Sequence, residues 1–479
     1  MKILRQSKEW LFLFVVLGIA VGLRLYKITS PLADWHSFRQ ADTASVTREY
    51  IKHGIDLLRP QYHDLSNIQS GKDNPSGYRM VEFPILNAIT ALLITLFRLQ
   101  QYEIVVGRLV SISYSIVGLF ALYALVRELT GKRAAGIALL TYAVMPYAVY
   151  YSRTILPEPA FVTSLLVSLA FLVYATRNKE NVFLYGMSIL SLTEAFLLKP
   201  FAIFFLPLFA YVFFREYRWK ALMQWQAYLF FLIPFIPFAL WRWWILSFPE
   251  GIPASDWLFN KDNIRFTGAF FHWLFEVRIA TLMLGIGLVI PAVLGLMKRG
   301  KDWLFYTVWA VCILAYMSIL AGGNVQHDYY QVVVMPFLCA VVGRGFAFLF
   351  ELSPRFINKP LLYIGGFGLF IWSLFTSWYQ LRGYYNINHP EIVQAGKAVD
   401  ALVPKDARII APYMGDTAFL YQTNRRGWPI GFEIDDKIKK GAQYYVSVNY
   451  DDEANALMKK YPVIEKTPMY VLVDLTRTK

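Results

Sequence analysis

The feature that most constrains this chain is a series of apolar stretches, each long enough to cross a membrane. A bilayer core about 30 Å thick is crossed by roughly 20 residues of α-helix. Eleven such stretches occur, at residues 10–27, 105–126, 134–151, 156–175, 182–197, 200–215, 226–245, 279–297, 303–321, 330–350 and 360–379. Only 17% of the 479 residues are charged and 57% are hydrophobic, which leaves too little polar surface for a soluble globule of this size. The sequence therefore predicts an all-α polytopic membrane protein with about eleven transmembrane helices.

Basic residues mark every second connection between these stretches. They lie at residues 127–133, 177–179, 215–220, 298–301 and 355–359. Because cytoplasmic loops are enriched in Lys and Arg, we expect these connections and the N-terminus to be cytoplasmic. Residues 28–104 then form a large first loop on the outer side. The basic residues lie in small clusters between apolar stretches, and these clusters account for the net charge of +14. We therefore expect no nucleic-acid partner.

One further apolar segment, residues 82–97, lies inside the first outer loop. Counting it as a crossing would invert every later loop and place the basic clusters outside. It begins with Glu-Phe-Pro and spans about sixteen residues, which favours a juxtamembrane helix on the outer interface over a full crossing.

The pattern changes after residue 379, where the hydropathy falls. Helices are expected at residues 391–402 and 452–461, and strands at 407–412, 443–448 and 469–474. This alternation predicts a small α/β domain over residues 380–479, following a transmembrane domain over residues 1–379. An odd number of crossings places the small domain outside.

Ionisable residues at a membrane are costly unless they have a partner or a task, so their positions are informative. The densest group follows the first span. A helix beginning near Ser37 would carry Asp42 beside Arg39, an arrangement that suits a base next to an anion. A surface ion pair, with Asp34 as a helix cap, explains the same pattern equally well.

Further charged residues fall in the outer segments, and each has a structural alternative. Glu82, next to Arg79, stands where a helix dipole would favour a carboxylate. Arg153 and Glu158 flank a proline-rich outer turn, where they could bind a substrate or pair with each other.

Three basic residues lie at the outer ends of apolar stretches. Lys199 could anchor a phosphate or extend its ammonium group to the interface. His327 could hydrogen-bond a phosphate oxygen or be an ordinary interfacial histidine, and Arg108 has the same two interpretations.

Together and in this order, these features resemble the GT-C superfamily of membrane glycosyltransferases. Within it, they resemble the branch of protein O-mannosyltransferases and aminoarabinose transferases, which is glycosyltransferase family 39-like. The resemblance covers about residues 1–350. Its motifs are the acidic segment after the first helix, Gly107-Arg108, Gly131-Lys-Arg133, Ser152-Arg153-x-x-x-Pro-Glu158, Leu-Lys199-Pro200 and His327-x-Tyr-Tyr330.

The resemblance implies sugar transfer from a polyprenyl-phosphate donor to a hydroxyl of a lipid, glycan or protein acceptor on the outer face of the membrane. It implies a bacterial inner membrane, with the active site facing the periplasm or the exterior. It also implies an inverting displacement with an aspartate base. This base is Asp42, with Asp34 as the alternative, because the family's acidic pair followed by tyrosine is absent. The implied substrate-binding residues are His36, Arg39, Glu82, Arg108, Arg153, Glu158, Lys199, His327 and Tyr330.

Cofactor use stays open at this stage. Carboxylates at Asp42, Glu82 and Glu158 could hold a divalent cation, since oxygen ligands suit magnesium, manganese or calcium. Two other functions fit a polytopic chain with scattered charges. One is a transporter or flippase for a lipid-linked or anionic substrate, although no paired repeat is visible. The other is a non-catalytic GT-C-like scaffold.

Overall fold

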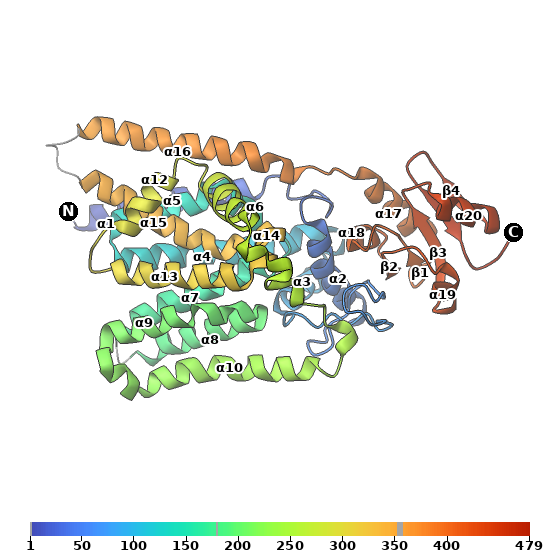
Figure 1. The fold of residues 1–479 in the computed structure, drawn as a ribbon, viewed down its shortest axis with the longest axis horizontal. Helices are drawn as coiled ribbons and strands as arrows, with labels where there is room; N and C mark the ends of the chain where they lie inside the picture. Colours follow the sequence, from blue (N-terminus) through green and yellow to red (C-terminus); the bar gives the residue numbers. More distant parts are fainter. Residues whose placement is uncertain (1, 179–180, 352–357) are drawn as a thin grey trace. The chain divides into compact units, whose positions relative to one another are not determined.

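The computed structural model describes residues 2–178, 181–351 and 358–479 (Figure 1). The chain is mostly helical and divides into two compact units. Unit 1 comprises Met1–Tyr26, Ser111–Trp241 and Ser255–Gly383, and unit 2 comprises Lys27–Val110, Arg242–Ala254 and Tyr384–Lys479. The predicted domain boundary near residue 379 stays a prediction. Lys179 and Arg355, which mark two predicted cytoplasmic loops, lie outside the described residues.

Unit 1 is a bundle of helices. Its α-helices are α1 (Lys2–Arg24), α4 (Glu103–Leu129, which begins in unit 2), α5 (Lys132–Val144), α6 (Pro146–Tyr151), α7 (Glu158–Arg177), α8 (Val182–Leu198), α9 (Leu206–Tyr217), α10 (Trp225–Ile245, which ends in unit 2), α11 (Gly268–Phe271), α12 (Val289–Met297), α13 (Trp303–Ile319), α14 (Ala321–Gln326), α15 (Met335–Glu351) and α16 (Lys359–Leu381). 3₁₀-helices occupy Pro200–Phe205, Arg218–Met223, Asp256–Leu258, Lys261–Phe266, Asp328–Val334 and Arg382–Tyr385. A π-helix occupies His272–Met283.

Six helical segments of the described chain are long and apolar enough to cross a membrane, as expected for a polytopic membrane protein. They are Gln100–Leu129, Glu158–Arg177, Pro200–Met223, Trp225–Ile245, Asp328–Glu351 and Lys359–Leu402. Of the other predicted spans, residues 10–27 lie mostly in the 23-residue helix α1, and the rest correspond to shorter or interrupted helices. The stretch at 134–151 is broken between α5 and α6, where Pro146 removes a backbone donor.

Close helix packing explains a second interruption, in the predicted span 279–297. Gly285 has a φ of 55°, and a Cβ atom there would lie 1.9 Å from the carbonyl oxygen of Ser373 in α16. Glycine is therefore required for the backbone to turn this close to a neighbouring helix. The helix breaks at this turn and resumes as α12.

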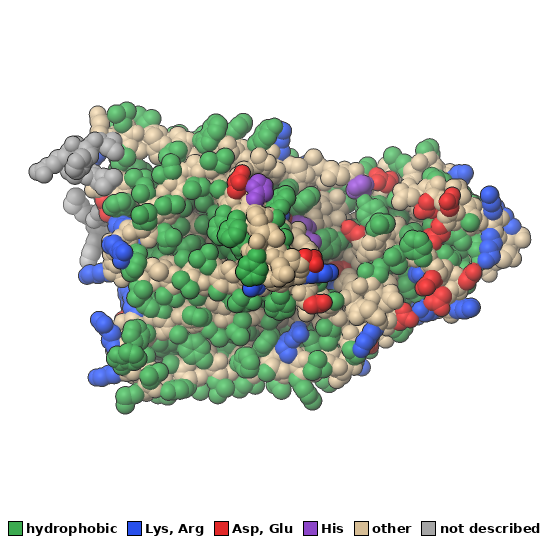
Figure 2. Space-filling view, viewed as in Figure 1, with side chains coloured by type: hydrophobic (Ala, Val, Ile, Leu, Met, Phe, Trp, Pro, Cys, Tyr) green, Lys and Arg blue, Asp and Glu red, His purple; other side chains and the backbone are tan. Residues whose placement is uncertain are grey.

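The surface of unit 1 has the polarity that a bilayer requires. Large hydrophobic side chains such as Leu11, Phe14, Leu232 and Phe367 are exposed on it. Figure 2 shows hydrophobic side chains covering the helices, with Lys and Arg side chains gathered at one end of the bundle, on the left of the view. An apolar belt closed by basic residues is typical of a membrane-embedded helix bundle.

Unit 2 joins the first loop to the C-terminal α/β region, residues 384–479. Its helices are α2 (Ser37–His53), α3 (Ile85–Phe97), α17 (Pro390–Leu402), α18 (Thr417–Gln422), α19 (Ile434–Lys439) and α20 (Asp452–Lys460), with short helical turns at Gln100–Tyr102 and Pro249–Gly251. The predicted start of a helix near Ser37 is confirmed. The apolar segment 82–97 forms α3, whose 13 residues fit the predicted juxtamembrane helix in the first loop.

The C-terminal region contains a five-stranded sheet with the order β2-β1-β3-β5-β4. The strands are β1 (Arg408–Ile410), β2 (Arg426–Trp428), β3 (Ala442–Ser447), β4 (Val463–Lys466) and β5 (Val471–Asp474). β1 runs parallel to β2 and β3, whereas β5 runs antiparallel to β3 and β4. The predicted α/β region is confirmed, and β2 and β4 are additions to the three expected strands.

The first loop is built into this sheet. The Leu65 amide donates to the Gly427 carbonyl (2.8 Å), and the Gly427 amide donates to the His63 carbonyl (2.9 Å). Ala33 and Leu65, also from the loop, belong to the hydrophobic cores on the two faces of the sheet. A Cβ atom at Gly427 would lie 1.7 Å from a carbonyl oxygen of β1, so this strand requires glycine. The loop and the C-terminal region therefore form one packed body.

Candidate functional site

Asp42 is held by three segments of unit 2. Its Oδ1 accepts a hydrogen bond from Oγ1 of Thr417 at the start of α18 (2.7 Å). Its Oδ2 accepts from Nε2 of Gln69 (3.2 Å) and lies 2.9 Å from Nη2 of Arg79. Asp42 is almost fully buried. A buried carboxylate is tolerated when charge-assisted hydrogen bonds replace its water, and both oxygens have such partners here.

Two further aspartates surround this position. Burial raises the pKa of Asp64 to about 6, and burial likewise raises the pKa of Asp416 to about 6. In both cases the negative charge of Asp42 adds to the increase. Asp416 also caps α18 by accepting from the Ala418 amide (2.7 Å). The region around Asp42 therefore carries excess acidity, which Arg79 partly offsets.

Arg39 and Glu82 form a second pair in the same unit. Nη2 of Arg39 donates to both carboxylate oxygens of Glu82, at 2.8 and 2.9 Å. The interpretation of Arg39 and Asp42 as a surface pair is wrong, because both are buried and each has a partner in the loop segment 79–82. Burial favours these cross-segment pairs, since a pair on one helix face would remain in water.

Asp34 lies in the linker between α1 and α2. Arg108, in α4, contacts this linker. Nε2 of Gln40 donates to Oδ1 of Asp34 (3.0 Å), and Nη2 of Arg108 lies 3.5 Å from its Oδ2. Nη1 of Arg108 also donates to the carbonyls of Ile28 and Ser30, at 2.8 and 2.6 Å. Arg108 therefore fixes the linker that positions Asp34. The predicted helix cap is wrong for Asp34, since the residue before α2 is His36.

His36 gives this linker its turn. It has a left-handed backbone (φ 54°), and its ring contacts those of Trp35 and Phe38 edge to face, with centroid separations of 5.1 and 5.9 Å. Trp35 also stacks on Tyr384, at 4.7 Å. These aromatic contacts pack the linker that carries Asp34.

In unit 1, Glu158 and Lys199 form a buried ion pair. Nζ of Lys199 lies 2.9 Å from Oε1 of Glu158, which is in the first turn of α7. Lys199 is only 7% exposed, so its expected extension to the interface does not occur. The alternative pairing of Arg153 with Glu158 is also wrong, since Arg153 is buried and donates to the Tyr26 carbonyl. Lys199, at the end of α8, reaches Glu158 because the two helices pack together.

His327 and Tyr330 lie in an aromatic cluster of unit 1. The His327 ring stacks on Tyr329 and Tyr330, with centroid separations of 5.3 and 6.4 Å, and contacts Trp257 edge to face at 5.6 Å. Between them in sequence, Asp328 is fully buried. It accepts a hydrogen bond from the Tyr151 hydroxyl and forms an ion pair with Arg278. The segment 327–330 thus combines a buried charged pair with an aromatic cluster in which Tyr329 and Tyr330 are themselves buried.

Sequence reasoning missed four polar residues: Gln69, Arg278, Asp328 and Thr417. Asp328 had a local signal, because it lies inside the His327–Tyr330 motif. The others are unremarkable in sequence and become informative only through contacts with distant residues.

The carboxylates proposed for a metal do not fit one in this arrangement. Asp42, Glu82 and Glu158 are each paired with an arginine or lysine. Among residues 2–178, 181–351 and 358–479, no group of three His, Cys, Asp or Glu side chains has metal-binding geometry. A cationic side chain and a metal ion compete for the same oxygen atoms, so no step of the chemistry is derived through a metal.

Comparison with known proteins identifies the fold. Residues 81–241 match the family described as dolichyl-phosphate-mannose-protein mannosyltransferase. The crystal structure of ArnT from Cupriavidus metallidurans bound to undecaprenyl phosphate superimposes with a TM-score of 0.69 at 15% identity, covering 96% of this chain and 97% of that chain. No curated protein is similar enough in sequence to count as a match.

An archaeal enzyme has the same architecture. The Archaeoglobus fulgidus oligosaccharyltransferase, in complex with Zn and sulfate, superimposes with a TM-score of 0.56 at 11% identity, covering 91% of this chain and 67% of that chain. AglB from the same organism, with an inhibitory peptide and a dolichol-phosphate, gives a TM-score of 0.52 at 10% identity, covering 99% and 74%. The GT-C fold and the resemblance predicted from the sequence are confirmed.

Proposed function

We propose that this protein is a glycosyltransferase that moves a sugar from a polyprenyl-phosphate donor to a hydroxyl group of a lipid, glycan or protein acceptor. The observation that carries the proposal is the likeness, over nearly the full length of both chains, to ArnT, which was solved with undecaprenyl phosphate. The family match over residues 81–241 supports the same class of donor. The proposed location is a bacterial inner membrane, with the site facing the periplasm or the exterior.

The chemistry needs a base and a group of cations. A carboxylate accepts the proton of the acceptor hydroxyl, and the hydroxyl oxygen attacks the anomeric carbon. The bond from that carbon to the phosphate oxygen breaks, and the polyprenyl phosphate leaves with the electron pair. A single displacement inverts the anomeric centre. Cationic side chains stabilise the negative charge that develops on the leaving phosphate.

Of the two candidate aspartates, the geometry favours Asp34 as the base. Asp42 ties together α2, the loop segment 69–79 and α18 through both of its oxygens. Proton transfer at Asp42 would weaken the contacts that hold these segments. Asp34 also has a partner at each oxygen, but Arg108 holds its linker independently through the carbonyls of Ile28 and Ser30, so the linker keeps its place when the Asp34 carboxyl takes up a proton. We therefore assign Asp42 to positioning and Asp34 to proton transfer.

Lys199 is the strongest candidate to bind the donor phosphate. Its ammonium group is buried beside Glu158, and because an ammonium has three N–H donors, it can hydrogen-bond a phosphate oxygen while it keeps this partner. Arg39, Arg153, His327 and Tyr330 are further candidates for contact with the phosphate or the sugar.

The test is sugar transfer from radiolabelled polyprenyl-phosphate donors in membranes that contain the wild type, Asp34→Asn or Asp42→Asn. Asp73→Asn is the matched control, since Asp73 is an exposed aspartate of the same loop. Loss of transfer in Asp34→Asn alone would support the proposed base. A wild-type protein that turns over none of the donors would favour the transporter, flippase or scaffold alternatives.

A further inference from the structure

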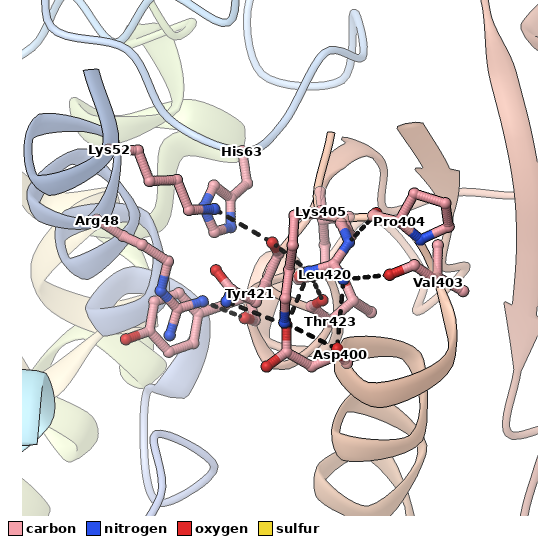
Figure 3. A network of polar contacts seen from close by, with 12 residues as sticks. Arg48, Lys52, His63, Asp400, Val403, Pro404, Lys405, Leu420, Tyr421 and Thr423 are labelled. Atoms are coloured by element: carbon pink, nitrogen blue, oxygen red, sulfur yellow. Dashed lines mark hydrogen bonds and ion pairs between the residues drawn. The ribbon is translucent and has the colours of Figure 1, made fainter. Parts of the chain in front are cut away.

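A polar cleft lies within unit 2, on the C-terminal half of α2. It has a volume of about 480 Å³ and is bounded by α2, the start of α4 and the C-terminal region from α17 to Asn424. Figure 3 shows Arg48 and Lys52 extending from α2 towards the residues of the C-terminal region. No step of the proposed glycosyl transfer uses these residues.

The two carboxylates of the cleft are already neutralised. Glu103 pairs with Arg48, whose guanidinium also lies 3.8 Å from the centre of the Tyr421 ring and donates to the Tyr421 carbonyl. Asp400 pairs with Arg425 and Lys405, each at 2.8 Å. These pairs fix the walls of the cleft and balance the negative charges of Glu103 and Asp400. Figure 3 shows Asp400 and Lys405 on the side of the C-terminal region.

Two ammonium groups of the cleft form no ion pair among the described residues, although Glu49, one turn earlier on α2, lies near Lys52. Nζ of Lys52 donates to the Asn424 carbonyl (3.2 Å), and within the described parts of the chain it has no carboxylate at ion-pair distance. Lys397, on the exposed side of α17, likewise has no ion-pair partner among the described residues. Two positive charges that converge on one cleft favour an anionic ligand.

The remaining lining indicates what carries the anion. Gln100 offers an amide group, and Gln422 and Asn424 offer amide oxygens, since their amide nitrogens already donate to the Leu32 carbonyl and to Asp400. Ile51 and Ala401 add apolar surface. Amides beside small apolar patches suit a ring that bears several hydroxyl groups. The cleft is therefore suited to a saccharide that carries a phosphate or carboxylate.

We propose that this cleft binds an anionic saccharide, as a second contact for the acceptor. The inference rests on the proposed glycosyltransferase function. Arg48 and Lys52 follow Asp42, the residue assigned to positioning the site, by six and ten residues on α2, and they follow the start of α2, next to the linker of Asp34, by eleven and fifteen residues, which is roughly 16–23 Å at 1.5 Å per residue. The acceptor would therefore extend over more than one sugar unit, with its anionic group in the cleft.

A binding measurement tests the cleft without requiring turnover. Saturation-transfer NMR on the purified full chain compares glucose 6-phosphate, glucuronic acid and uncharged glucose. The double variant Lys52→Gln/Lys397→Gln removes both free charges, and Lys459→Gln makes the same change on an exposed lysine of α20 in the same region. We expect roughly tenfold weaker binding of both charged sugars to the double variant and unchanged binding to the control.

Equal binding of glucose 6-phosphate by the wild type and the double variant would overturn the proposal, as would equal binding of glucose and glucose 6-phosphate by the wild type. The two single variants guard against a folding defect, because each should show part of the loss while melting at the wild-type temperature. A chain without transfer activity that still binds the charged sugars through Lys52 and Lys397 would refute the enzymatic proposal but leave the cleft in place.

A second binding experiment distinguishes an anionic saccharide carried by a lipid from a free one. Phosphatidylcholine vesicles with phosphatidylinositol 4-phosphate present a lipid-borne phosphorylated ring, whereas glucose 6-phosphate is free. A difference between wild type and double variant with glucose 6-phosphate alone names a free saccharide as the source, and a difference in both arms names a saccharide that a lipid can also carry. The absence of a difference with glucose 6-phosphate overturns the proposal.

Discussion

Charged side chains are organised differently in the helix bundle of unit 1 and in the joined loop and C-terminal region of unit 2. In unit 1 the buried charges form separate pairs, such as Lys199 with Glu158 and Arg278 with Asp328, whereas larger groups such as Glu9 with Arg127 and Lys132 include half-exposed side chains. In unit 2 they form connected networks, in which Asp42 alone contacts three segments. A buried pair is closed on itself, whereas a buried network of several polar groups can link distant segments.

The contrast distinguishes residues that mainly stabilise the fold from residues that also position the candidate site. Removal of one partner from a closed pair leaves a buried charge and costs stability. A network member instead controls how several segments are positioned. The predictions below test this distinction, from the largest expected effect to the smallest.

The largest effect is expected for the proposed base in unit 2. Asp34→Asn should lower sugar transfer by roughly 10²–10⁴-fold, because a general base contributes about that much. Asp42→Asn should lower both transfer and melting temperature, since it loosens the loop. Steady-state transfer and thermal unfolding of the same preparations check this. Full activity of Asp34→Asn, with loss in a stable Asp42→Asn, would reverse the two assignments.

In unit 1, the closed pair of Lys199 and Glu158 should respond to charge balance. Lys199→Met leaves Glu158 buried and unpaired, at a cost of about 3–5 kcal/mol in the free energy of unfolding. The double variant Lys199→Met/Glu158→Gln should regain most of the stability but not the transfer activity. Thermal unfolding and transfer are measured on both variants. Restored activity in the double variant would mean that Lys199 has no role with the phosphate.

A pH-dependent effect is expected at Asp64. Burial raises its pKa to about 6, so the native state holds this proton more tightly than the unfolded chain does. Its desolvation therefore costs up to about 3 kcal/mol above pH 6, and this cost disappears as the pH falls towards 4. Asp64→Asn should melt higher than the wild type at pH 7, with the difference shrinking at pH 5.

The comparison with Asp64→Asn is needed because His63 acts in the opposite direction. Burial lowers the pKa of His63 to about 4, so its contribution to stability is lost as the pH falls below about 6.5. His63 is common to both proteins and cancels in their difference. A melting difference that does not change with pH would show that Asp64 does not titrate in this range.

The smallest effect is expected for Thr417, the contact from the C-terminal region to Asp42. Thr417→Val should cost about 1–3 kcal/mol, because it removes a hydrogen bond to a charged group. Thr417→Ser keeps the hydroxyl and should behave almost like the wild type. Melting temperature and transfer rate are compared for the pair. Equal losses in both variants would assign the effect to packing of the methyl group.

Much of the fold could be predicted from local sequence. The apolar stretches correspond to helices, Ser37 begins α2, and the strands at 408–410, 442–447 and 471–474 were expected. β2 was missed because its three residues, Arg-Gly-Trp, carry no alternating pattern, and it forms only against β1 and the first loop. Interruptions such as the turn at Gly285 depend on a neighbouring helix and were not visible in composition.

By itself, the sequence determined the membrane class, the outer-loop charges and the candidate residues, because hydropathy and charge act locally along the chain. Only the tertiary structure decided the partners of those charges. Arg39 lies three residues from Asp42 but pairs with Glu82, while Asp42 pairs with Arg79 and Thr417. Burial makes unpaired charges costly, so each charge takes the partner that packing brings within reach, whatever their separation in sequence.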